Sequence, residues 1–131
     1  MDKRSQILQF AEPYRNLAEV LKDHKLASLG DAYVNFVYSL ALSIKRKQPS
    51  GAKVKSSVLA DALRRAKLRE YMPSGIDNHT LADAAEALLV YAWLQSHITI
   101  EESVEALARN ADPVDGLTRL IEIIRRRIRL S

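Results

Sequence analysis

The sequence contains no cysteine among its 131 residues, and this absence excludes several kinds of chemistry together. Disulfide bonds, thiolate nucleophiles and zinc sites with cysteine ligands all need the missing side chain. The absence also fits a reducing compartment such as the cytosol. Glycine and proline occur only four times each, so long stretches of the chain run without a residue that breaks helices.

Long apolar runs are also missing. No stretch approaches the roughly 18 apolar residues of a membrane-spanning helix. The opening residues, MDKRSQILQF, lack the apolar segment and the small-residue cleavage site of a signal peptide. We therefore expect a soluble, cytoplasmic protein that makes no membrane contact. A length of 131 residues with 47% apolar side chains predicts one globular domain over residues 1–131.

Basic residues are absent from one long segment. Residues 70–108 contain seven Asp and Glu but no Lys or Arg. All 20 Lys and Arg lie elsewhere with nine acidic residues, a balance of +11. A basic body around an acidic centre suits an enzyme that acts on nucleic acid, because Lys and Arg hold phosphates and carboxylates hold metal. A mixed surface whose charges happen to cluster is the alternative.

The spacing of apolar residues predicts an all-α fold of about six helices. The first three are expected over residues 5–23, with Pro13 kinking or splitting the helix, over 26–46 and over 54–71. The sequence QPSGA at 48–52 is the clearest loop, since Pro and Gly both break helices.

The second half of the chain carries clear helix starts. A fourth helix should follow the loop MPSGIDNHT and end near Gln95. Thr99 and Glu102 form a capping box for the fifth helix, and Asp112 followed by Pro113 begins the sixth. The tail IIRRRIRL alternates Ile and Leu with Arg, so it either docks on the core, which we expect, or lies along an anionic partner.

Three similar tetrapeptides each place an aspartate inside an apolar helical run: LGDA at 29–32, LADA at 59–62 and LADA at 81–84. A buried charge without a partner costs several kcal/mol, so such a residue normally has a counter-ion, a metal or water. Asp61 has Arg64 and Arg65 three and four residues later, which predicts an exposed ion pair. Only the other two copies remain candidates for function.

Asp31 and Asp83 each lie three residues after a Ser or Thr, the spacing of a capping box. This structural explanation does not extend to Glu86, one turn beyond Asp83 in LADAAEALLVYAWL, a stretch without basic residues. Two carboxylates on one face of an apolar helix raise each other's pKa or need a cation. If Asp31 faces them, the three form a site of hard oxygen ligands such as Mg²⁺ accepts.

At these residues the sequence resembles a known family. The stretch LASLGDAYVNFVYSLALS is similar to the first signature helix of the ribonuclease III family. TLADAAEALLVYAWL is similar to the second signature helix, and KVKSSVLADALRRAKLREYM resembles the segment that connects the two. The likeness spans residues 26–94 in the family's order and approximate spacing.

This resemblance implies an all-α endonuclease domain that forms a homodimer and cleaves double-stranded or structured RNA with Mg²⁺ or Mn²⁺. By position, Asp31, Asp83 and Glu86 would bind the metal, and Asp31 and Glu86 would be catalytic. Gly30 would match the glycine that lets two helices approach closely.

The sequence departs from the family pattern at one acidic position. The family has a further glutamate four residues before the first aspartate, where this chain has Ala27, followed by Ser28 in place of a bulky residue. Compact members without an RNA-binding domain, the mini-ribonuclease III type, also lack that glutamate. The chain likewise leaves no room for a double-stranded-RNA-binding domain. Ala27 thus puts the strength of the metal site in doubt without excluding catalysis.

Basic residues flank the first predicted loop and are the expected RNA contacts: Lys45, Arg46, Lys47, Lys53 and Lys55. An ordinary solvated loop is the alternative. His24 lies two turns before Asp31 and is either a supporting residue of the site or a surface histidine. Three functions therefore compete: a metal-dependent endoribonuclease, a noncatalytic relative that binds structured RNA or a ribosomal particle, and a helical protein-interaction module.

Overall fold

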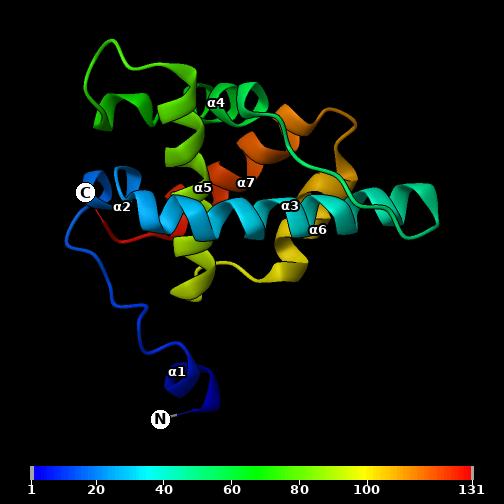
Figure 1. Ribbon diagram of the computed structural model, residues 1–131, viewed down its shortest axis with the longest axis horizontal. Coiled ribbons are helices and arrows are strands. Elements are labelled where there is room, and N and C mark those ends of the chain that lie inside the picture. Colours follow the sequence, from blue (N-terminus) through cyan, green and yellow to red (C-terminus); the bar gives the residue numbers. More distant parts are fainter. Residues whose placement is uncertain (1, 131) are drawn as a thin grey trace.

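The computed structural model describes residues 2–130, and this part of the chain holds seven α-helices, one 3₁₀ turn and no β-strand (Figure 1). The all-α prediction is confirmed. The elements, in chain order, are α1 (Lys3–Ile7), α2 (Leu17–Leu21), α3 (His24–Arg46), α4 (Ser56–Arg65), η1 (Arg69–Tyr71), α5 (Asn78–Leu94), α6 (Ile100–Arg109) and α7 (Pro113–Arg127).

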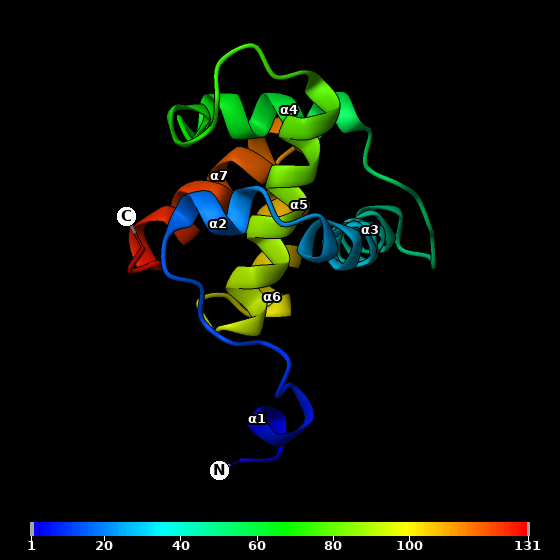
Figure 2. The same ribbon diagram turned by 60° about the vertical axis from the view of Figure 1, so that its left-hand side comes forward.

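Helix α5 is the central column of the fold. Twelve of its 17 residues are buried, because apolar side chains occupy every face of the helix rather than a single stripe. It contacts α2, α3, α4 and α7, which surround it in Figure 2. Even so, none of the helices within residues 2–130 is both long and apolar enough to span a bilayer.

Helix α3 crosses α5 and presents a different kind of side chain on each of three faces, because residues four apart lie on one side of a helix. The buried face includes Gly30, Val34, Val37 and Ala41. A second face, which we call the polar row, consists of Asp31, Asn35, Ser39 and Ser43. A third face, the apolar row, consists of Ala32, Phe36, Leu40 and Ile44 and is largely exposed.

The crossing of α3 and α5 is closest at Gly30. A Cβ atom added there would lie 2.0 Å from the carbonyl oxygen of Glu86 and 3.0 Å from its Cβ atom. No side chain fits in that space, so only glycine permits the two backbones to approach so closely. The role that the family resemblance assigns to Gly30 is confirmed, and the contact brings Glu86 next to the residue after Gly30, Asp31.

The first predicted helix, residues 5–23, is wrong in extent, although it is split as Pro13 suggested. Two short helices, α1 and α2, replace it, and residues 11–14 between them have no regular structure. Proline lacks the N–H that a helix interior needs. Asn16 then starts α2 by accepting a hydrogen bond from the N–H of Glu19 (2.9 Å).

The third predicted helix, residues 54–71, is also wrong at both ends. Helix α4 begins at Ser56 and ends at Arg65, and Lys67 adopts a left-handed conformation (φ 62°) that stops it before η1. Within α4, the predicted pair of Asp61 with Arg64 is present at 3.1 Å. Arg65 instead pairs with Asp115 of α7 at 3.0 Å.

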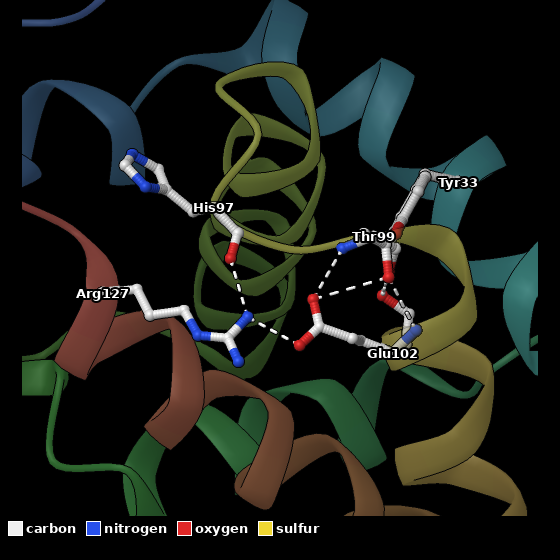
Figure 3. Close-up of polar contacts among 6 residues, drawn as sticks. Tyr33, His97, Thr99, Glu102 and Arg127 are labelled. Atoms are coloured by element: carbon white, nitrogen blue, oxygen red, sulfur yellow. Dashed lines mark hydrogen bonds and ion pairs between the residues drawn. The ribbon is translucent and has the colours of Figure 1, made fainter.

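The C-terminal tail docks on the core, as expected from its alternating pattern. Ile124 and Ile128 are buried. Arg127 pairs with Glu102 (Nη1 to Oε2, 2.7 Å) and donates to the carbonyl oxygen of His97 (3.0 Å), as Figure 3 shows. The predicted capping box of Thr99 and Glu102 is confirmed, so one carboxylate both caps α6 and holds α7.

Replacing Gly30 by alanine should lower the free energy of unfolding by about 2–3 kcal/mol, because the added methyl group meets the backbone of α5 and forces the helices apart. The matched control is Gly51→Ala, since nothing lies within 4 Å of a Cβ atom there. That substitution should change stability by less than about 1 kcal/mol. Urea denaturation followed by circular dichroism measures both, and equal stability of the two variants would contradict the proposed close crossing.

Candidate functional site

A cavity of about 360 Å³ opens where α3, α4 and α5 meet. All three carboxylates singled out from the sequence line it, together with two histidines and several small or apolar residues. The lining residues are His24, Ala27, Ser28, Asp31, Val54, Ser56, Leu59, His79, Asp83 and Glu86. The tertiary structure therefore brings Asp31 to the same cavity as Asp83 and Glu86, which are 52 and 55 residues further along the chain.

Glu86 is the buried member of the three, with 8% of its surface exposed. Burial raises the pKa of its carboxyl group to about 8, and the Asp31 carboxylate contributes through a hydrogen bond and through its charge, followed by the charge of Asp83. No Lys or Arg forms an ion pair with Glu86 in the described part of the chain. Glu86 therefore carries a proton near neutral pH unless a cation replaces it.

Asp31 and Asp83 do not cap helices. The N-cap of α3 is Asp23, which accepts from the N–H groups of Lys25 (2.8 Å) and Leu26 (3.0 Å). The N-cap of α5 is Asp77, which accepts from the N–H of Thr80 at 2.9 Å. The capping explanation of both aspartates is wrong, because each helix begins several residues earlier than its Ser or Thr signal. Asp31 is exposed at the cavity and Asp83 is half-buried.

Two histidines complete the rim of the cavity. His24 Nδ1 lies 4.0 Å from Asp83 Oδ2, so the histidine at the start of α3 faces the carboxylate of α5 rather than Asp31. His79, which we did not single out from the sequence, also lines the cavity. Its position four residues before Asp83 is the signal that identifies it, since residues four apart share a helix face.

The cavity is not a closed metal cage. Among residues 2–130, no three His, Asp or Glu side chains are arranged closely enough to chelate one ion directly. Mg²⁺, however, commonly keeps several water ligands and is held by one or two carboxylates plus substrate phosphates. The hard oxygens of Asp31 and Glu86, which line the same cavity and influence each other electrostatically, are the donor pair that fits this kind of binding.

The structure divides the predicted basic cluster into two groups, all of whose members are exposed. Lys53 and Lys55 flank Val54, which lines the cavity. Lys45, Arg46 and Lys47 lie at the other end of α3, about 14 residues or 21 Å along the helix axis from Asp31. Lys45 donates a hydrogen bond to the carbonyl oxygen of Asn110 (2.7 Å). Only the first group lies beside the carboxylates.

Asn35 is the contact of Asp31 that sequence reasoning missed. Its Nδ2 atom donates to Asp31 Oδ1 at 3.1 Å. The signal was present in the sequence, because Asn35 follows Asp31 by four residues and begins a run of polar residues at the same interval along α3.

The fold and the cavity together define a class: an all-helical domain in which carboxylates from two closely crossing helices face one solvent-open cavity. Comparison with protein-family models assigns that class. The ribonuclease III model matches residues 24–129, and the chain belongs to the ribonuclease III family. The match covers most of the chain. No curated protein matches the chain significantly.

The raised pKa of Glu86 predicts a specific pH dependence of stability in the absence of metal. Between about pH 4.5, where an unfolded glutamate ionises, and about pH 8, the folded state binds the proton more tightly, so stability falls as pH rises. Glu86→Gln should remove this component and be more stable than the wild type at pH 9, by on the order of 3 kcal/mol, but not at pH 4. Urea denaturation at several pH values measures the difference.

The control for this experiment is Glu122→Gln, which alters an exposed glutamate on α7. Its stability should follow the wild-type pH profile throughout. If Glu86→Gln also follows that profile, the carboxyl group of Glu86 is ordinarily solvated and its proposed burial beside Asp31 is contradicted.

Proposed function

We propose that this protein is a metal-dependent endoribonuclease that hydrolyses phosphodiester bonds in double-stranded or structured RNA. The observation that carries the proposal is the buried carboxyl group of Glu86 beside Asp31, in a cavity open to solvent and without a Lys or Arg ion pair at Glu86 in the described chain. Membership of the ribonuclease III family supports RNA as the substrate class.

The residues of the cavity fit Mg²⁺ or Mn²⁺ in their chemistry, since carboxylate oxygens are the ligands that these ions prefer. A bound metal would supply Lewis-acid polarisation of a phosphate oxygen and an activated water. Asp31 and Glu86 would hold such an ion directly, with the carboxyl group of Glu86 in its ionised form. Asp83, half-buried beside His24, adds negative charge that favours the cation.

The exposed Lys53 and Lys55 lie next to this cavity and would hold RNA phosphates there. Contacts to phosphates supply affinity without reading sequence, and double-stranded RNA is recognised largely by its shape and its 2′-hydroxyl groups. The arrangement therefore suits a duplex substrate whose backbone passes over the carboxylates.

One observation favours the noncatalytic alternative. At the position of the family's further glutamate, Ala27 lines the cavity with a methyl group and contributes no oxygen. A relative that kept the fold and the basic surface with a weaker metal site would bind structured RNA or a ribosomal particle without cleaving it. The helical interaction module, by contrast, loses its main support because Asp31 and Asp83 do not cap helices.

The decisive test is to incubate the protein with a long RNA duplex and Mg²⁺ or Mn²⁺. The wild type should cleave, and Asp31→Asn and Glu86→Gln should each reduce the rate at least about 100-fold, because each removes a charged ligand oxygen from the site. The matched control is Asp61→Asn, which changes the aspartate of the tetrapeptide LADA at 59–62, paired with Arg64 on the surface. It should cleave at the wild-type rate.

The same assay separates the alternative. Duplex binding that weakens steeply with salt, with no cleavage in either metal, would establish an RNA-binding relative and contradict the endonuclease proposal. Cleavage that survives in Glu86→Gln would show that the reaction takes place elsewhere.

We also propose that two copies of the chain pair through α3. Leu29, Phe36 and Ile44 on its outer side are 41%, 55% and 60% exposed, although each is large and apolar. Leu29 continues the apolar row one turn earlier, so these side chains line one side of the helix. Contiguous exposed apolar surface of this kind marks an interaction site.

Phe36→Glu should convert the dimer to a monomer, because it places a charge at the centre of the apolar row. Light scattering at micromolar concentration should give twice the mass of the chain for the wild type and a single mass for the variant. Arg119→Glu, at an exposed position on α7, is the control and should remain dimeric. A monomeric wild type would rule out this pairing.

A further inference from the structure

The segment before α4, residues 50–55, which we call the strap, is held along α3 by an unusual set of hydrogen bonds. The N–H of Ser50 donates to Ser43 Oγ at 2.9 Å, and that of Ala52 donates to Ser39 Oγ at 3.0 Å. The N–H of Val54 donates to Asn35 Oδ1 at 2.8 Å. Three members of the polar row therefore accept from every second residue of the strap, which runs antiparallel to the helix.

The geometry of the two elements explains why these bonds form together. Four residues of an α-helix rise about 6.0 Å, and two residues of extended chain rise about 6.6 Å, so the side chains and the alternate N–H groups keep nearly the same interval. The side chains of α3 thus supply the hydrogen-bond acceptors that the backbone of a neighbouring strand supplies in a sheet.

The last of these bonds connects the strap to the acidic site. Asn35 accepts from the strap through Oδ1 and donates to Asp31 through Nδ2 (3.1 Å). The amide orientation is determined by its partners, because a backbone N–H needs an acceptor and a carboxylate needs a donor. Asn35 is the one member of the polar row that bonds both to the strap and to Asp31 of the acidic site.

The strap also carries basic residues on its other side. Because side chains alternate along an extended chain, the residues that bond to α3 are half-buried, whereas Lys53 and Lys55 are exposed. The placement of these two ammonium groups relative to Asp31 therefore depends on the bond between Val54 and Asn35.

We propose that Asn35 is a positioning residue that fixes the strap, and with it Lys53 and Lys55, relative to the Asp31 carboxylate, so that an RNA phosphate backbone held by the strap lies at the correct offset from the acidic cavity. This inference rests on the proposed function and specifies which residue aligns substrate binding with the reacting site. Asn35 itself touches neither the substrate nor the reacting atoms.

Two variants separate this role from simple anchoring of the strap. Asn35→Ala removes the acceptor of the Val54 N–H and the donor of Asp31, whereas Ser39→Ala removes both hydrogen bonds between Ser39 Oγ and the backbone of Ala52 and leaves Asp31 untouched. Amide hydrogen exchange followed by NMR should show faster exchange at Val54 in the first variant and at Ala52 in the second. Affinity for an RNA duplex without divalent metal should fall about 5-fold in both, because each variant releases one point of attachment of the strap to α3.

The two variants should differ in cleavage kinetics. Asn35→Ala should lower kcat about 10-fold in addition to raising KM, because misplacement of the substrate by less than 1 Å slows the reaction strongly. Ser39→Ala should raise KM and keep kcat within about twofold, since Asp31 retains its donor. Thr118→Ala, which removes a hydroxyl bonded within α7 away from the cavity, is the control and should change none of these quantities.

Three results would overturn the inference: unchanged exchange at Val54 in Asn35→Ala, an unchanged affinity for RNA in that variant, or the same kcat in Asn35→Ala and Ser39→Ala in an active enzyme. A wild type that binds the duplex but does not cleave it refutes the endonuclease proposal alone, and exchange and affinity then decide the role of Asn35. A wild type that does not bind RNA refutes both.

Discussion

The close approach of α3 and α5 at Gly30 is the contact on which the rest of the structure depends. With 2.0 Å between a hypothetical Cβ atom and the Glu86 carbonyl oxygen, the backbones meet where one helix has no side chain. Since Asp31 follows Gly30, the same contact sets the separation of the two carboxyl groups. The same helix crossing therefore determines both the packing of the core and the geometry of the acidic cavity.

That contact also explains the electrostatic state of the site. Helix α5 is apolar on every face, so a carboxyl group on it is poorly solvated, and the neighbouring charge of Asp31 further disfavours ionisation of Glu86. The raised pKa of Glu86 means that a proton neutralises this carboxyl group near pH 7 in the absence of metal, and stability falls when that proton is lost. In the proposed function a divalent cation would replace the proton, so metal affinity would rise with pH.

Helix α3 combines three tasks because its faces repeat at intervals of four residues. One face packs on α5. The polar row holds the strap and includes Asp31, and the apolar row remains exposed for the proposed second copy. The order of side chains along this one helix thus relates the core, the acidic cavity and the basic strap to one another. Asn35 belongs to two of these relations, since it accepts from the strap and donates to Asp31.

The sequence by itself determined the all-α class, the C-terminal end of α3, the capping box at Thr99 and the candidacy of Asp31, Asp83 and Glu86, because helical periodicity and the lack of a basic neighbour are local properties. It did not determine where α3 and α5 begin, since Asp23 and Ser28 both have the chemistry of a cap and only the packed core selects between them. Nor did it show the strap or His79 beside the cavity. Those features join residues distant along the chain, and only tertiary packing brings their side chains within hydrogen-bonding or Coulombic range.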